Sequence, residues 1–566
     1  MQQRMKLLFT SVLMLCASIA VSQKNYPQDF RHPLDIPLLL SGTFGELRSN
    51  HFHSGIDIKT QRRQGLKIYS IGDGYVSRIK VSLWGFGKAL YVTHPNGYTS
   101  VYAHLQKFSP EIEAYVKQRQ YGKETFELEL FPNAEELKFA KGDVIAFSGN
   151  SGGSGGPHLH FEIRDTATEK PINPLHFGMT VKDGRPPLLQ GVFAYPIDGK
   201  AQVNQSNRLV NLTYKATGAN TFVADKIYAS GRVGFGINSY DRQDLTYNKN
   251  GVYQVTTYLN GAKKFSYDFE SFSFGETRYI NTFIDYKRYH QKRQRVQRLY
   301  KTPANVLSIY QSDDDGIFTF EDGLAYDIKI EILDFHGNVT SLLIPVEGKD
   351  MKIEHPEEVT ITDKFIIAKR DNLYQLGDDS VFFPKNTFYE NLYADIKKSG
   401  DTLLIHDRTV PVRKRFTVSM DVSEYSEKEK QQLFIANLTR KGRPSYNRTY
   451  KKGHTFSTRM RTLGKFFLEK DTVAPKITPA NFKDGKWLSN YSYLRIKIQD
   501  DLSGIDTYQG TIDGEWVLFE YEPKTKMLTY NFSDKKLLGT KHLVELVVTD
   551  NVGNSTTFTS TFFRKE

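Results

Sequence analysis

Short runs of alternating hydrophobic and polar residues fill the chain between about residues 66 and 105. They read LKIYSI, GYVSRIKV, KALYVTH and TSVYAHL, and the glycine-bearing turns IGDG, LWGFG and PNG separate them. Such alternation is typical of strands with one buried face, and short turns join antiparallel neighbours. We therefore predict a compact antiparallel β domain. Residues 108–139 interrupt the pattern with a short helical period and extended pieces, and we interpret them as an insertion.

Strand-like runs with turn residues continue beyond about residue 186, where helical signals become sparse. Their spacing is typical of β-sandwiches. Two segments each contain a strand, an Asp-x-x-Gly-Asn turn (Asp334–Asn338 and Asp550–Asn554) and a Thr-rich strand. Because glycine supplies the positive φ that such a turn needs, we expect a repeated immunoglobulin-like hairpin. Between these segments, residues 351–470 show strands and one short helical stretch, SEYSEKEKQQ, and their fold is left open.

The predicted fold class is mainly β, with an antiparallel β domain followed by about three β-sandwich, immunoglobulin-like modules. The aromatic content agrees, because 33 Tyr and 38 Phe against 8 Met favour pleated surfaces over helices. The predicted boundaries are 1–22 for a signal peptide, 23–185 for the first domain with its insertion 108–139, 186–350 and 471–566 for two sandwiches, and 351–470 for a β-rich module.

Length and composition set the class of protein. A chain of 566 residues corresponds to about three to five domains. Hydrophobic residues make up 39%, charged residues 25% and aromatic residues 13% of the chain. These values exclude a disordered tail protein, a collagen-like repeat and a multispan membrane protein.

The opening MQQRMKLLFTSVLMLCASIAVS has the three parts of a secretory signal. Arg4 and Lys6 come first, an apolar run follows from Leu7 to Leu15, and small residues continue to Ser22. The apolar run is shorter than the ~20 residues of a membrane span, and no later segment qualifies. We expect an exported protein of the periplasm or cell envelope, or a secreted one, with no transmembrane segment in the mature chain.

The only cysteine, Cys16, lies inside the predicted signal. It follows Leu15, whereas lipoprotein processing needs a small residue there, so lipidation is not expected. A mature chain starting near Gln23 would have no disulfide. Loss of the two basic signal residues lowers the formal charge from +12 to +10. Outside the cytoplasm, this excess indicates cell wall or anionic lipid as the acidic partner before nucleic acid, for which we expect no binding.

Eight of the fourteen histidines fall between residues 32 and 176, so we look for chemistry there. The first segment is HFHSGIDIKT, in which Gly55 and the isoleucines on both sides of Asp57 predict a turn that enters a strand. Asp57 would then face away from both isoleucines into a polar site. His51 lies on the same face as His53 and could replace it, but the Gly-x-Asp spacing favours His53.

The second segment is HLHFE, where strand geometry puts His158 and His160 on one face, ~7 Å apart. One of them can bind a metal while the other reaches a substrate. The third is YAHL, with His104 at a strand end. A lone His-x-His is more often a solvated or core pair. Here, however, the glycine-rich NSGGSGGP leads straight into it and would let a substrate backbone pass close by. Glu162 could orient a ring N–H of His160 or form a surface salt bridge.

Together these segments resemble the lysostaphin-type (LytM-like) zinc peptidoglycan endopeptidases. The resemblance covers about residues 38–178, roughly a quarter of the chain. It rests on FGELRSNHFHSGIDI, GDGYVSRI, WGFGKALYVTHPNGYTSVYAHL and KGDVIAFSGNSGGSGGPHLHFEI. The insertion and the later modules depart from the family pattern.

The resemblance implies a role for each of five residues. His53, Asp57 and His160 correspond to the ligands of Zn²⁺, and this set leaves zinc one open position, as in catalytic sites. His158 and His104 correspond to the residues that act on the water and on the intermediate, with exchangeable roles. All five positions are occupied, so nothing marks the chain as a noncatalytic family member.

We therefore predict an exported zinc metallo-endopeptidase that hydrolyses the peptide cross-links of peptidoglycan, its acidic wall-polymer partner. Two alternatives are a noncatalytic zinc-domain regulator of another cell-wall hydrolase and an envelope-binding adhesin. We expect the C-terminal modules to position the enzyme, either by contact with anionic wall or other envelope proteins or by restricting the catalytic cleft. Two basic runs, Lys287–Arg295 and Arg440–Lys452, are interpreted first as charged faces and second as sites that bind wall polymer.

Overall fold

The structure is a computed structural model that describes residues 25–312, 314–358 and 360–565. The predicted signal peptide, residues 1–22, lies outside the described residues. The chain is mainly β, as predicted. The α-helices of the described residues are α2 (Pro110–Lys123), α3 (Ile280–Phe283), α4 (Tyr286–Lys292) and α5 (Glu427–Gln432).

The first region consists of a nine-stranded and a three-stranded sheet over one hydrophobic core. In the large sheet the strand order is β1-β2-β11-β6-β5-β4-β8, and all of these neighbours are antiparallel, as the alternation predicted. The strands are β1 (Leu40–Gly42), β2 (Ile56–Lys59), β4 (Gly74–Val81), β5 (Lys88–Thr93), β6 (Tyr98–Leu105), β8 (Leu128–Leu130) and β11 (His158–Asp165), with β9 (Lys138–Phe139) and β12 (Pro171–Ile172) at its edges and β3 (Lys67–Tyr69), β10 (Val144–Phe147) and β7 (Lys107–Phe108) in the small sheet.

The insertion contains α2 and the short strands β8 and β9, which pair with β4. Helix α2 begins directly after Ser109, with Pro110 in its first turn, where a missing backbone N–H costs nothing. It buries Ile112 and Val116 against the first core. The mixture of helix and extended pieces that the sequence indicated is therefore present.

The second region is a twelve-stranded sheet, and its core also contains Phe44, Leu47 and Phe52 of the first region. Its main path runs β15-β13-β18-β24-β23-β19-β20. These strands are β13 (Leu188–Pro196), β15 (Val210–Leu212), β18 (Ile227–Tyr240), β19 (Gln254–Leu259), β20 (Ala262–Asp268), β23 (Ala325–Leu333) and β24 (Val339–Gly348).

The third and fourth regions each have two larger sheets over one core, and the third also has a two-stranded sheet of β25 (Phe365–Ile366) and β28 (Leu392–Tyr393). In the third, the sheets are β26 (Asn372–Leu376), β27 (Asp379–Phe383), β31 (Phe416–Asp421), β35 (Thr455–Met460) and β34 (Thr449–Lys452), facing β29 (Ile396–Ser399), β30 (Thr402–Ile405), β36 (Gly464–Lys470), β32 (Leu433–Leu438) and β33 (Pro444–Tyr446). In the fourth, they are β37 (Lys476–Pro479), β39 (Tyr493–Gln499), β43 (Met527–Asn531) and β42 (Phe519–Glu522), facing β38 (Lys486–Trp487), β45 (Ser555–Phe563), β44 (Lys541–Asp550), β40 (Ile505–Ile512) and β41 (Glu515–Trp516).

The two predicted Asp-x-x-Gly-Asn turns are hairpins. One joins β23 to β24 and the other joins β44 to β45, with continuous antiparallel registers on both sides. Gly337 and Gly553 have φ values of 85° and 97°, the positive values predicted for these turns.

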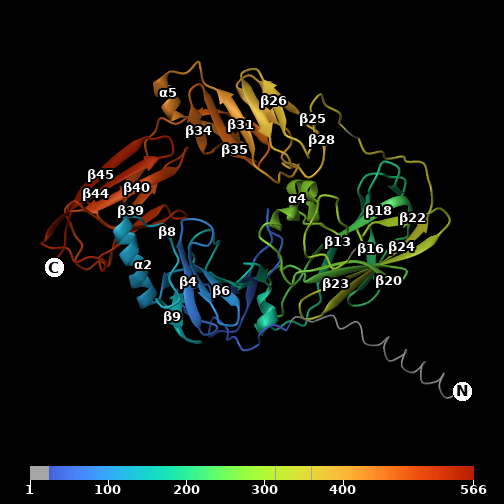
Figure 1. Cartoon of the computed structure of the whole chain (residues 1–566), viewed down its shortest axis with the longest axis horizontal. Coiled ribbons are helices and arrows are strands. Elements are labelled where there is room, and N and C mark those ends of the chain that lie inside the picture. The colour runs from blue at the N-terminus through green and yellow to red at the C-terminus, as the bar shows by residue number, and fades with distance from the viewer. Residues whose placement is uncertain (1–24, 313, 359, 566) are drawn as a thin grey trace, which may run out of the picture.

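The four regions follow one another in a closed circuit, so that the fourth region lies beside α2 of the first (Figure 1). The ring of Tyr121 on α2 meets the ring of Trp516 edge-on, with centroids 5.3 Å apart. Lys117, one turn earlier on α2, forms an ion pair with Asp534. The insertion thus contacts the far end of the chain.

Candidate metal centre

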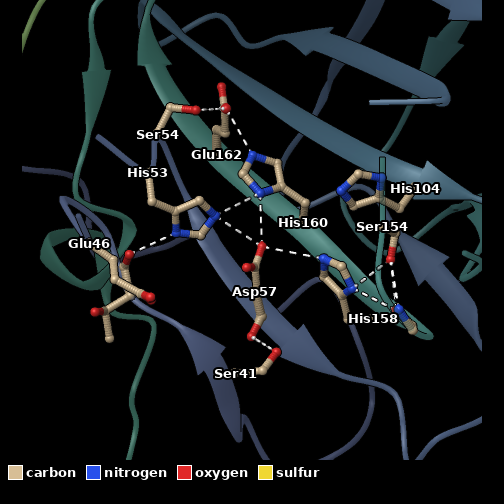
Figure 2. Close-up of polar contacts among 12 residues, drawn as sticks. Ser41, Glu46, His53, Ser54, Asp57, His104, Ser154, His158, His160 and Glu162 are labelled. Carbon is tan, nitrogen blue, oxygen red and sulfur yellow. Dashed lines mark hydrogen bonds and ion pairs between the residues drawn. The ribbon is translucent and has the colours of Figure 1, made fainter. Parts of the chain in front are cut away.

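Strand register gathers the histidines at one end of the large sheet. Strand β11 lies between β2 and β6, so His160 stands opposite Asp57 on one side and Ala103 on the other. His104 is the residue after Ala103, and His158 is two residues before His160 on the same face of β11. The isoleucines beside Asp57 are fully buried, which leaves the carboxylate on the other face, as predicted. Figure 2 shows these side chains pointing toward one another.

Three donor atoms converge at the centre of this group. His53 Nε2 lies 3.0 Å from Asp57 Oδ1 and 3.0 Å from His160 Nδ1, and Asp57 Oδ1 lies 2.9 Å from His160 Nδ1. All three residues are buried. Two imidazole nitrogens and one carboxylate oxygen, each within one small triangle, form a group that can hold a metal ion.

His53 and Asp57 each use their remaining polar atom in a hydrogen bond outside the triangle, so the triangle atoms stay available to a metal. The other ring nitrogen of His53, Nδ1, donates to the Thr43 carbonyl at 2.7 Å. The second oxygen of Asp57 accepts from the Arg48 guanidinium at 2.9 Å. Burial raises the pKa of Asp57, but His53, His158 and His160 outweigh it and hold that pKa well below its usual value. Asp57 is therefore ionised, as a metal ligand must be.

Glu162 fixes the orientation of His160. Its Oε1 accepts from His160 Nε2 at 2.9 Å, which leaves Nδ1 facing the triangle. The same carboxylate accepts from the Ser54 hydroxyl and from Arg164. Burial would raise the pKa of Glu162, yet Arg164 and His160 lower it to about 2. Of the two roles considered for Glu162, the structure shows the contact with the ring N–H of His160.

His158 and His104 lie beside the triangle and are held in the same way. His158 Nδ1 donates to the Gly156 carbonyl at 2.8 Å, and its Nε2 lies 3.5 Å from Asp57 Oδ1. His104 Nδ1 donates to the Ser151 carbonyl at 2.9 Å, and the two imidazole rings are 4.8 Å apart. Burial, with His160 and His158 nearby, lowers the pKa of His104 to about 3. Each ring therefore presents Nε2 to the site.

The structure distinguishes His53 from His51, the alternative candidate for the same position. His51 is exposed, and its Nδ1 contacts the neighbouring Asn50 side chain. His94, which lies outside the three histidine segments, is buried and contacts the Asp73 carbonyl and Ser100.

The glycine-rich loop before His158 contacts the fourth region. Lys524, in the turn between β42 and β43, donates its ammonium to the carbonyls of Asn150 and Ser154, the latter at 3.2 Å. The Ser154 hydroxyl lies 3.1 Å from His158 Nδ1. Glu520 of β42, the strand before this turn, forms an ion pair with Lys88 of β5 at 2.9 Å. The sequence did not indicate this contact, because 370 residues separate Lys524 from Ser154.

Exchange of the Glu162 carboxylate for an amide should loosen metal binding. Glu162→Gln keeps the shape but removes the charge that holds His160, and loss of such an outer partner weakens metal affinity by about 10–100-fold. Competition with a chromogenic chelator measures this affinity. Glu169→Gln is the matched control, because Glu169 contacts the same Arg164 from an exposed position. Equal affinities in the two variants would contradict the role of Glu162.

Comparison with known proteins decides the family of the first region. Residues 51–121 match the model of peptidase family M23. Over these residues the first region is similar to peptidase family M23, and we call it the M23 domain for that similarity. A second model, that of a Zu5-like domain, matches residues 363–471, the part of the chain whose fold the sequence left open.

The curated relatives are similar to only a part of this chain. This chain is 32% identical over 129 residues to the "DD-carboxypeptidase/endopeptidase Mpg" of Neisseria meningitidis serogroup B, a match covering 23% of each protein. It is 30% identical over 151 residues to an "Uncharacterized metalloprotease" of Haemophilus influenzae, a match covering 26% of each. The chain thus spans about a quarter of the length of the curated relatives it matches.

Solved structures overlap with a similar part of the chain. The lysostaphin catalytic domain of Staphylococcus simulans is 19% identical, with a TM-score of 0.19, and the match covers 25% of this chain and 93% of that domain. A zinc-containing peptidase of Vibrio cholerae is 23% identical, with a TM-score of 0.20, over 28% of this chain and 40% of that one. Within residues 25–565, no helix has both the length and the apolar character needed to cross a membrane.

Proposed function

We propose that the M23 domain is a zinc-dependent endopeptidase that hydrolyses the peptide cross-links of bacterial peptidoglycan. The observation that carries the proposal is the triangle of His53 Nε2, Asp57 Oδ1 and His160 Nδ1, with His158 and His104 beside it. The printed name of the Neisseria relative, a carboxypeptidase and endopeptidase, supports the same reaction class.

The donor set fits zinc. Ligands at 2.0–2.1 Å in a tetrahedron stand about 3.3 Å apart, so the triangle needs to open by only a few tenths of an ångström. The outer bonds from Thr43, Arg48 and Glu162 hold the three ligands while leaving the triangle atoms free. With only three protein ligands, one tetrahedral position stays open for water or substrate.

Zinc bound there would supply a Lewis acid that polarises the scissile carbonyl and acidifies the attacking water. His158 takes the water proton on Nε2, because its Nδ1–H is already committed to the Gly156 carbonyl. His104, held by the Ser151 carbonyl, receives this water proton on Nε2 from His158, contacts the developing oxyanion with it and passes it to the leaving amine, so that no second proton source is needed. The equivalent arrangement of the two rings keeps these roles exchangeable.

Removal of the metal tests this function. Purified full-length protein should release soluble muropeptides from purified sacculi, lose this activity after treatment with a chelator, and regain it with one equivalent of zinc. Fragment release is measured by liquid chromatography. Sustained hydrolysis by protein that is free of metal by elemental analysis would contradict the proposal.

We place this enzyme outside the cytoplasm, in the periplasm or cell envelope, or secreted. The sequence pattern of residues 1–22 supports export, and the peptidoglycan substrate requires it. We also propose domains at 23–185, 186–350, 351–470 and 471–566. Strands β1–β12, β13–β24, β25–β36 and β37–β45 fall within these four segments in turn, which supports the division.

For the fourth region we propose the second of the two predicted roles, restriction of the catalytic cleft. Lys524 and Glu520 tie this region to the loop that orients His158 and to Lys88 beside it. Burial would lower the pKa of Lys88, but Glu520 and Glu113 raise it, so Lys88 carries the positive charge that Glu520 pairs with. A wall contact remains the role proposed for the two basic runs, which meet where Arg440 contacts His290.

Loss of the Lys524 contact should speed turnover. Lys524→Ala removes two hydrogen bonds to the glycine-rich loop, and a net ~1 kcal/mol favouring the docked state corresponds to roughly fivefold in the open population. Initial rates on soluble cross-linked muropeptides measure the effect. Lys541→Ala, an exposed lysine of β44 in the same region, is the matched control. A Lys524→Ala rate equal to or below that of Lys541→Ala would remove the cleft-restricting role.

A further inference from the structure

Three aspartates meet where the M23 domain joins the second region. Asp183 lies before β13, Asp241 follows β18, and Asp334 begins the hairpin turn between β23 and β24. Asp241 and Asp334 are each only 3% exposed. Ligand atoms of Asp183 and Asp334 and of the exposed His336 lie within 4.8 Å of one another. The Asp241 carboxyl is within hydrogen-bonding reach of Asp183.

Two of these carboxylates, those of Asp183 and Asp241, line a small pocket that contains polar atoms without partners. Asp183, Asp241 and Gln243 line it, and its volume is about 20 Å³, enough for one ion or one water. Asp241 Oδ1 and Gln243 Oε1 have no hydrogen-bond partner, although both residues are 97% buried. A buried oxygen without a donor is costly, so a bound cation or donor would stabilise these two oxygens.

No lysine or arginine neutralises the cluster, and the exposed His336 is the titratable nitrogen beside it. In the described part of the chain, no lysine or arginine forms an ion pair with Asp183, Asp241 or Asp334. Arg185 forms an ion pair with Asp244 instead. Burial, followed by the charges of Asp183 and Asp334, raises the pKa of Asp241 to about 8. A bound cation would offset both the burial of the Asp241 carboxylate and its repulsion by the other two aspartates.

The fourth region repeats the same three positions. Asp471, Asp500 and Asp550 have ligand atoms within 4.8 Å of one another. Asp500 follows β39 as Asp241 follows β18, and Asp550 starts the second Asp-x-x-Gly-Asn hairpin. In both copies the turn asparagine donates to the backbone carbonyl of the first aspartate, at 3.3 Å in one region and 3.0 Å in the other. The position of His336 is taken by Val552 in the second copy, so the shared ligand set is carboxylate alone.

We propose that Asp183, Asp241 and Asp334, with the side-chain oxygen of Gln243, form a structural Ca²⁺ site. Several hard oxygen donors and no shared nitrogen or sulfur match the preference of Ca²⁺. The site is distinct from the zinc triangle, whose ligands are two imidazoles and one carboxylate.

The position of the site gives the ion a structural task. The cavity is also lined by Thr43 of the M23 domain and by Gly251 of the second region. The Gly251 N–H donates to the Thr43 hydroxyl at 3.0 Å, and the Thr43 carbonyl accepts from His53. An ion here would brace the junction between the two regions next to the residue that orients His53.

Calcium titration of the intact protein tests the site. Full-length protein, stripped of metal and reloaded with one equivalent of zinc, is titrated with CaCl₂ by calorimetry, and its Tm is measured with and without Ca²⁺. We expect wild type to bind Ca²⁺ and to gain several degrees in Tm. Asp241→Asn should bind one ion fewer per chain and lose most of that gain. Asp198→Asn is the control, because this exposed turn aspartate of the same region accepts backbone N–H bonds, which an asparagine can also accept.

Two results would overturn the site. One is absence of Ca²⁺ binding by wild type at about 5 mM, above the affinity range of extracellular calcium modules. The other is unchanged stoichiometry in Asp241→Asn. If the aspartates instead share a proton, Ca²⁺ will leave the Tm unchanged and Asp241→Asn will raise it. Should Asp241→Asn fail to fold, Asp183→Asn provides the same comparison from a less buried position.

Discussion

Replacement of His160 by alanine is expected to remove the bound zinc and to reduce peptidoglycan hydrolysis to background. His160 Nδ1 is one corner of the donor triangle. Its loss leaves only His53 and Asp57 as ligands, which are too few to retain the metal during gel filtration. Elemental analysis after gel filtration measures the zinc, and fragment release from sacculi measures activity.

His51→Ala is the matched control for this variant. His51 is also a histidine of the HFH segment, but it is exposed and contacts Asn50. We expect His51→Ala to keep one zinc per chain and the wild-type rate. Full zinc occupancy and activity in His160→Ala would show that the triangle is not the metal site.

His158→Ala should separate turnover from metal binding. His158 Nε2 lies at the edge of the triangle, 3.5 Å from Asp57 Oδ1, and is not one of its corners. Removal of a general base costs about 10²–10⁴-fold in rate, whereas the three ligands remain. We expect one zinc per chain with hydrolysis reduced by that factor. Simultaneous loss of zinc would instead make His158 a ligand.

Much of the site could be predicted because it follows from local strand geometry. Alternation places Asp57 opposite its buried neighbours and puts His158 and His160 on one face. The Gly-x-Asp spacing selected His53 over His51, and the structure has His53 in the triangle. The contacts that hold these residues were less accessible to sequence reasoning. Arg48 and Thr43 reach the site from an irregular segment whose path depends on packing.

The fold was predictable for similar reasons. Alternating runs and glycine turns sufficed for the antiparallel first region, and the Asp-x-x-Gly-Asn pattern sufficed for both hairpins. Residues 351–470 have short strands that pair across long intervals, such as β27 with β31 and β30 with β36, so no local signal set their order. The contact of Lys524 with the glycine-rich loop depends on the closed circuit of four regions, which no single segment encodes.

Mass spectrometry of products from a defined, cross-linked muropeptide dimer tests the central claim most directly. Full-length protein with one equivalent of zinc should split the dimer into two fragments whose summed mass exceeds that of the dimer by one water. His158→Ala, loaded with zinc, should leave the dimer intact over the same period. An intact dimer with zinc-loaded wild type, together with stimulation of a separate hydrolase, would contradict the enzyme and support the noncatalytic regulator.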